Sequence, residues 1–219
     1  MNKLRLRYSK TQRAKYISHL DLMSTMQRAL LRAEIPLQYS QGFNPHPYLS
    51  VALPLPVGLD STCELMDIRV TEETLDLTGI AQKITACLPD GLEVTDCYIP
   101  AVKFTEIAWI EIHGTLIFDS GPPADAVAGL RGRYAQKSIL ISKKTKRGMS
   151  DIDIAQHIKD VEFLHGSNIT LSAKISAQNP TLSPDNFISA LKGEYDELFP
   201  DYAFFSRKEI FDSNMTVFK

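Results

Sequence analysis

The order of strand-like and helix-like segments is the feature that most restricts the fold of this chain. Residues 3–8 alternate charged and apolar side chains with a period of two, which predicts a strand. Residues 18–33 then carry apolar side chains at spacings of three and four, which predicts an amphipathic helix. The following segments predict strands at 37–39, 48–55 and 64–70, a helix at 74–88 and a strand beginning at 92–94. This is a β-α-β-β-α-β order with one extra hairpin strand.

The second half of the chain repeats this order. Its segments predict a strand at 105–118, a helix at 124–134, a strand at 137–142, short strands at 152–154 and 161–164, a strand at 168–176, a helix at 183–195 and a strand at 202–211. We therefore expect an α+β protein made of two ferredoxin-like (split βαβ) lobes, with antiparallel sheets and helices packed on one face. The expected domains are residues 1–100 and 105–219.

Basic residues are concentrated in the first 50 residues. Eight Lys and Arg stand there against two acidic residues, a net charge of +6, whereas the other 169 residues hold 16 basic and 24 acidic residues, a net charge of −8. A basic segment on an acidic body favours an anionic partner such as a nucleic acid. Lys3, Arg5 and Arg7 form a basic row on one face of the first strand and are candidate nucleic-acid contacts. Alternatively, some of these bases pair with the acidic body and the rest are solvated.

Residues 39–48, YSQGFNPHPY, contain more glycine, proline, polar and aromatic residues than a turn requires. An ordinary connection has about 2 to 6 residues and needs only a Gly or an Asn. Here two prolines flank one histidine, and each proline restricts the local backbone. The candidate binding residues in this loop are Tyr39, Gln41, Gly42, Phe43, Asn44 and His46. The alternative is a structural turn in which Asn44 bonds its own backbone.

The start of the first predicted helix supplies a second group of candidates. Ser18 followed by Asp21 fits the capping-box pattern, with Ser18 as the N-cap. His19 lies in the first turn, where free amide hydrogens and the helix dipole favour anions. If His19 meets His46, a carboxylate could orient one ring as a general base or metal ligand, and Asp21 and Glu64 are the candidates. We assign no metal ligands, because no local signature such as HExxH is present.

Several protein classes lack their sequence signatures in this chain. It contains no GxxxxGK[ST], GxGxxG or GxSxG motif, so nucleotide-hydrolase, Rossmann and α/β-hydrolase functions have no support. No apolar run reaches membrane-spanning length and the first residues have no hydrophobic core, so we expect a cytoplasmic protein with no membrane partner. Cys63, Cys87 and Cys97 are not closely spaced, so they do not predict disulfides, a zinc ribbon or the three-cysteine cradle of radical SAM enzymes.

Several short motifs occur in the first third of the chain: ISHLDLM at 17–23, RAL at 28–30, RA at 32–33, YSQGFNPHP at 39–47 and LPLPVG at 53–58, followed by Glu64 and Asp67. Together they resemble the bacterial radical-SAM-linked protein family. The resemblance is strongest over residues 3–70, and a looser block follows with KKTKRG at 143–148 and DIDI at 151–154. Because Arg28 is one of the matching residues, it joins the candidate binding residues.

The resemblance implies a partner rather than a reaction. Members of the family occur fused behind a radical SAM enzyme or as a separate small protein, as this chain would be. S-adenosylmethionine and an iron–sulfur cluster are then expected on the partner enzyme, and no cofactor is expected on this chain.

Two functions follow for the chain itself. The first is a non-catalytic accessory or substrate-binding protein that works with a radical SAM enzyme. RNA is a candidate substrate, because related layouts bind RNA through stacking aromatics. The alternative is an enzyme of unknown type that uses His19, Asp21, Asn44 and His46, with or without a metal ion.

Overall fold

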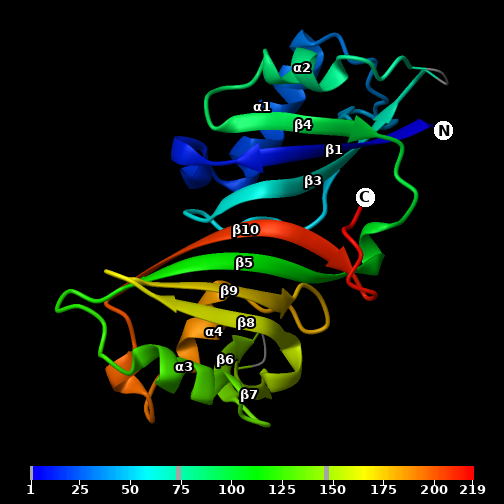
Figure 1. Cartoon of the computed structure of the whole chain (residues 1–219). Helices are drawn as coiled ribbons and strands as arrows, with labels where there is room; N and C mark the ends of the chain where they lie inside the picture. Colours follow the sequence, from blue (N-terminus) through cyan, green and yellow to red (C-terminus); the bar gives the residue numbers. More distant parts are fainter. Residues whose placement is uncertain (1, 73–74, 146–147) are drawn as a thin grey trace. The chain divides into compact units, whose positions relative to one another are not determined.

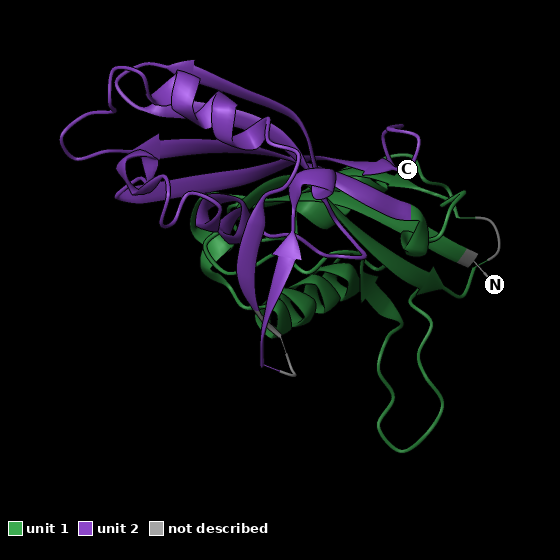
Figure 2. Cartoon of the chain, turned by 90° about the horizontal axis from the view of Figure 1, so that it is seen from below, with its two compact units in different colours: residues 1–106, 219 green, residues 107–218 purple. Residues whose placement is uncertain are grey.

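The computed structural model describes residues 2–72, 75–145 and 148–219 and shows an α+β protein (Figure 1). Its contacts divide the chain into two compact units, residues 1–106 with 219, and residues 107–218 (Figure 2). This division does not test independent folding, so the expected domains at 1–100 and 105–219 stay predictions. Within the described ranges, no helix is both long and apolar enough to cross a membrane.

The first unit combines an antiparallel sheet with two α-helices. Its elements are β1 (Asn2–Lys10), the 3-10 helix η1 (Gln12–Tyr16), α1 (His19–Arg32), β2 (Leu49–Val51), β3 (Asp60–Val70), α2 (Ile80–Thr85), β4 (Leu92–Tyr98) and η2 (Phe104–Glu106). The strands pair in the order β4-β1-β3-β2, and every pair is antiparallel.

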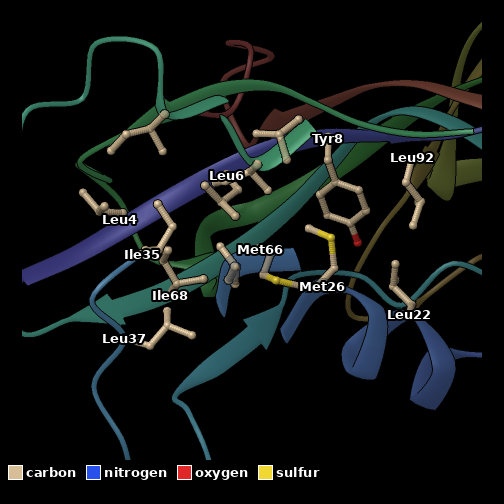
Figure 3. Close-up of a cluster of buried hydrophobic side chains, with 14 of the residues drawn as sticks. Leu4, Leu6, Tyr8, Leu22, Met26, Ile35, Leu37, Met66, Ile68 and Leu92 are labelled. Atoms are coloured by element: carbon tan, nitrogen blue, oxygen red, sulfur yellow. The ribbon is translucent and has the colours of Figure 1, made fainter. Parts of the chain in front are cut away.

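The apolar faces of β1 and α1 meet in one core (Figure 3). Leu6 lies opposite Met66 in the β1–β3 register, and Tyr8 points from the sheet toward Met26 of α1. All four side chains are fully buried, as is Ile84 of α2. Burial of each large apolar side chain stabilises the fold by about 1.5 to 3 kcal/mol. This layer therefore holds both helices against one face of the sheet.

The second unit also combines antiparallel strands with two α-helices. Its elements are β5 (Ile107–Ile117), α3 (Ala126–Tyr134), β6 (Leu140–Thr145), β7 (Gly148–Asp153), η3 (Ala155–His157), β8 (Ile158–His165), β9 (Ile169–Ser176), α4 (Pro184–Ser189), η4 (Asp196–Leu198) and β10 (Tyr202–Asp212). Four of its strands pair antiparallel in the order β10-β5-β9-β8, and β6 pairs with β7 in a hairpin. Tyr134 of α3 stacks on Phe187 of α4 with 4.1 Å between ring centroids.

Most predicted elements are present in the predicted order, but the second helix is shorter than expected. The helix expected at 74–88 forms only over α2, and residue 74 lies outside the described residues. Before α2, the Thr78 N–H donates to the Asp76 carboxylate at 2.9 Å. Gly79 then takes a φ of 74°, which is left-handed backbone that glycine adopts readily. These two features form a turn where the apolar spacing alone predicts another helical turn.

Two further expectations differ from the structure, and a third lies partly outside the described residues. The helix expected at 183–195 ends at Ser189 in α4, and Gly193 takes a φ of 88°. The strand expected at 37–39 is reduced to isolated bridges. In the basic run at 143–148, residues 146 and 147 lie outside the described residues.

Ser18 caps α1 as the sequence predicts, and its removal should weaken the fold. Its Oγ accepts a hydrogen bond from the Asp21 N–H at 3.1 Å and donates to Asp21 Oδ2 at 2.7 Å. We expect Ser18→Ala to lower the free energy of unfolding by about 1 kcal/mol, measured by urea denaturation. Ser24→Ala, at an exposed position of the same helix, is the control and should leave the midpoint unchanged or slightly raised. An unchanged midpoint for Ser18→Ala contradicts a stabilising cap.

Candidate functional site

The loop at residues 39–48 is attached to the end of β3. The Gln38 N–H donates to the Arg69 carbonyl at 2.9 Å, and the Arg69 N–H donates to the Tyr48 carbonyl at 3.1 Å. The Arg69 guanidinium also lies over the Tyr48 ring, 4.5 Å from its centroid, which is a cation–π contact. A bridge between Tyr39 and Pro47 closes the base of the loop. The loop therefore starts from backbone that the sheet holds in place.

Ser40 fixes His46 within this loop. The Ser40 N–H donates to the His46 carbonyl at 2.9 Å, and the His46 N–H donates to Ser40 Oγ at 3.1 Å. Ser40 Oγ also lies 3.0 Å from His46 Nδ1. When this hydroxyl donates to Nδ1, the neutral ring carries its proton on Nε2 and offers a donor to solvent. Sequence reasoning missed Ser40, although a serine at a loop entry often bonds nearby backbone.

The tip of the loop exposes an aromatic ring and an amide. Phe43 is fully exposed, and Gln41 and Asn44 are exposed beside it. Gly42 has a φ of 128°, a conformation that is relaxed only for glycine. The Asn44 carbonyl lies 3.4 Å from His46 Nδ1, and within the described residues the Asn44 side chain makes no hydrogen bond. The turn is thus held by Ser40 and not by the Asn44 amide.

A buried lysine that sequence reasoning missed fixes the start of α1. Lys10 pairs with Ser61 in the β1–β3 register, and its Nζ donates to the carbonyls of Lys15 at 3.2 Å and Ile17 at 3.1 Å. Burial lowers the pKa of the Lys10 ammonium, and the negative charge of Glu64 acts in the opposite direction. Glu64 is itself buried on β3. The negative charge of Glu64 therefore acts on Lys10, and its predicted role in orienting a histidine stays a prediction.

The segments that carry His19 and His46 are attached at opposite ends of β3. The start of α1, where His19 lies, is tied to the Ser61 end, whereas the loop of His46 leaves from the Arg69 end. These ends are eight residues apart, or about 26 Å along the strand. Asp21 bonds Ser18 at the helix start. The structure does not bring the predicted cluster together, and in its described part no group of three or more His, Cys, Asp and Glu is arranged to hold a metal ion.

Arg5 lies in a buried ion pair and not on an exposed basic row. Its Nε donates to Asp67 Oδ1 at 2.7 Å, and its Nη2 donates to Asp67 Oδ2 at 3.1 Å and to the Val102 carbonyl at 3.0 Å. The guanidinium also lies over the Phe104 ring, 4.3 Å from its centroid. Lys3, which is partly exposed, pairs with the same carboxylate. The cross-strand register explains this outcome, because Arg5 lies directly opposite Asp67.

Exposed positive charge is found instead on and before α1. Arg13 of η1 and Arg28 and Arg32 of α1 are exposed, whereas Arg7 of β1 is only half-buried. Arg32 donates to the carbonyl of Cys87, which follows α2. The basic character of the first 50 residues is therefore divided between internal ion pairs and the outer surface of α1.

Comparison with protein families places the chain in a bacterial group. The family described as "Uncharacterized protein conserved in bacteria (DUF2344)" matches residues 3–184. The chain belongs to this family. The match covers the whole first unit except its first residues and continues through most of the second, so the candidate loop lies within the DUF2344 region.

Other comparisons add little to the family assignment. A comparison with curated proteins found no match. Among solved structures, an unknown protein from Galdieria sulphuraria is 11% identical, with 94% of this chain and 98% of that chain covered and a TM-score of 0.28. At this TM-score the similarity supports no conclusion about fold or function.

Removal of Arg5 should destabilise the protein strongly. In Arg5→Met the Asp67 carboxylate stays buried with Lys3 as its remaining ion-pair partner, and we expect a loss of about 3 to 5 kcal/mol in the free energy of unfolding. Urea denaturation of the purified variant measures this loss. Arg13→Met is the control and should change stability by less than about 0.5 kcal/mol.

The double variant Arg5→Met/Asp67→Leu separates the ion pair from simple packing. It removes both charges together, so it should be less destabilised than Arg5→Met alone. A single variant as stable as the wild type contradicts the structural role of the pair.

Proposed function

We propose that this protein is a non-catalytic accessory protein that binds RNA for a radical SAM enzyme. The observation that carries the proposal is the loop at residues 39–48, which holds a fully exposed Phe43 on a base fixed to β3. Burying an aromatic ring stabilises a fold. A ring that stays exposed on a fixed loop can instead be buried against a ligand, and the free energy of its burial then stabilises the complex. Single-stranded nucleic acids use such rings as stacking platforms, at about 1 to 3 kcal/mol per base.

The surroundings of Phe43 suit a base rather than a purely apolar ligand. Asn44 offers an amide that can donate and accept, and His46 can offer a donor from Nε2. RNA bases are recognised by stacking together with hydrogen bonds to their edges. The loop has one aromatic face and polar groups within four residues of it, which is the combination that base recognition needs.

We also propose that each unit is a ferredoxin-like lobe. In the order β4-β1-β3-β2, the first strand of the series lies between the fourth and the third, and the second strand is at the edge. The order β10-β5-β9-β8 repeats this arrangement, with the β6–β7 hairpin inserted between α3 and β8. Two βαββαβ series with the same pairing order support a split βαβ arrangement for both units. Lobes of this kind are common in RNA-binding proteins.

The partner in this proposal comes from the resemblance of the chain, strongest over residues 3–70, to radical-SAM-linked proteins. On this proposal the radical SAM enzyme carries S-adenosylmethionine and the iron–sulfur cluster, and this chain delivers or holds the substrate. An accessory role does not require His19 and His46 to share a site. The segments that carry them are attached at opposite ends of β3.

The RNA proposal predicts that Phe43→Ala weakens RNA binding. Loss of one stacked base should reduce affinity by about tenfold for a single-stranded RNA of about 12 nucleotides, measured by fluorescence anisotropy. Phe204→Ala removes a partly exposed phenylalanine of β10 and is the matched control. Equal affinities for the wild type and Phe43→Ala, or an equal loss in the control, contradict recognition by this loop.

Asn44→Ala and His46→Ala test the polar part of the same loop. Asn44→Ala should leave stability within about 0.5 kcal/mol, and His46→Ala should cost up to about 1 kcal/mol because it removes the contact with Ser40. Both should reduce RNA affinity and complementation in cells. Variants that unfold early and complement in proportion to their abundance indicate a structural loop instead.

The partnership predicts a complex in cells. A tagged form of the chain, purified from its bacterial host, should retain a radical SAM protein, and mass spectrometry identifies it. The isolated chain, treated anaerobically with iron and sulfide, should hold no stable cluster. Recovery of RNA without any radical SAM protein contradicts the partner, and a stoichiometric cluster on the isolated chain contradicts the accessory role.

A further inference from the structure

A cleft of about 530 Å³ lies in the first unit beside α1 and the end of α2. One wall is a stripe on α1 formed by Thr25, Arg28 and Arg32. These residues are three and four positions apart, so they share one face of the helix. The segment that follows α2, including Cys87, forms the other wall. The volume is within the range of small-molecule sites, about 300 to 1,000 Å³.

The charge in this cleft is positive and incompletely neutralised. No carboxylate is among its lining residues in the described chain. Asp90, the nearest acidic residue along the sequence, lines a neighbouring hollow that shares Leu88 and Pro89 with the cleft. Two like charges one helical turn apart destabilise a helix by a few tenths of a kcal/mol. Arg32 lies in the last turn of α1, where the helix dipole favours a cation, but the repulsion between the two arginines remains for an anionic ligand to offset.

The two arginines differ in how they are held. Arg32 donates to the Cys87 carbonyl, and this bond turns its guanidinium toward the far wall of the cleft. Arg28 is exposed and, within the described structure, has no hydrogen bond or ion pair. One guanidinium is therefore fixed in place, and the other has its donors open to a ligand.

We propose that this cleft binds a phosphate group through Arg28, Arg32 and Thr25. Guanidinium groups present paired N–H donors that match the oxygens of phosphate, and a threonine hydroxyl adds a further donor. The phosphate can come from the backbone of RNA or from a free nucleotide. The RNA source rests on the proposed function, whereas phosphate binding itself does not.

The reactivity of Cys87 can be used to measure ligand binding in this cleft. Cys87 lines the cleft and is only partly buried, whereas Cys63 is fully buried. Burial, with a smaller contribution from Asp96, raises the pKa of the Cys97 thiol to about 11, so little of it is thiolate at neutral pH. A neutral thiol reagent such as N-ethylmaleimide should therefore modify Cys87 first.

The test measures the rate of Cys87 modification with and without pyrophosphate, read by mass spectrometry of the peptide. At a pyrophosphate concentration ten times its dissociation constant, modification should slow by roughly tenfold, because about one molecule in eleven remains free. Sodium chloride at matched ionic strength controls for screening. An unchanged rate in pyrophosphate overturns the proposal.

Variants of the exposed arginines give the second arm of the test. Arg28→Gln should weaken pyrophosphate protection by about tenfold or more, and Arg28→Lys should lose less because it keeps the charge without the fork. Arg13→Gln, an exposed arginine of η1 outside the cleft, should be protected like the wild type. Equal protection of Arg28→Gln and the wild type overturns the proposal, and calorimetric titration with pyrophosphate repeats the comparison without the thiol.

The two phosphate sources are separated by adding a short single-stranded RNA or ATP in place of pyrophosphate. Protection by RNA assigns the cleft to the RNA backbone, and protection by ATP but not RNA assigns it to a free nucleotide. In the second case phosphate binding in the cleft is supported, whereas RNA binding is not. The Phe43→Ala measurement tests RNA binding independently of the cleft.

Discussion

A buried carboxylate on β3, that of Asp67, constrains much of the first unit. Removing Asp67 from water is costly unless its oxygens are bonded, and Arg5 and Lys3 of β1 supply those bonds. A slip of one residue between β1 and β3 would carry Arg5 to the apolar face under α1. The ion pair therefore fixes the strand register. Arg5 also holds the Val102 carbonyl, so the path of the chain after β4 depends on the same charge.

The fold was largely predictable because most segments show a single dominant period. Residues 168–176 alternate cleanly and form β9, and the apolar spacing of residues 18–33 forms α1. Alternation identifies the two faces of a strand, but it does not say what covers the second face. Val102 and Phe104 cover that face near Arg5. The polar row of β1 was therefore interpreted as exposed when part of it is internal. The charge of Asp67 opposite Arg5 was the signal in the sequence that could have corrected this.

The candidate loop was identifiable from its composition, but its relation to the helix start was not. A helix that connects two parallel strands of one sheet runs back along the strands, so its start and its end lie at opposite strand ends. His19 is the first residue of such a helix, and His46 lies in the loop that follows the end of this helix. The two residues are therefore separated by the length of the helix. The positions of His19 and His46 in the sequence predict their separation only when the helix between them is taken into account. Ser40 and Lys10 were missed because both act through backbone carbonyls and amides, which carry no residue-specific pattern.

The position of Lys10 has a consequence for how the first unit opens. Its ammonium group bonds the carbonyls of Lys15 and Ile17, so residues 11–17 cannot move away from β1 without leaving a buried ammonium group without these acceptors. Gly58 also donates to the Lys15 carbonyl at 2.9 Å, which adds the segment before β3 to the same group. We expect segments linked in this way to exchange their amide hydrogens together, as one cooperative unit of local unfolding. This unit would join the end of β1 and the start of α1 to the entry of β3, which is distant from both in the sequence.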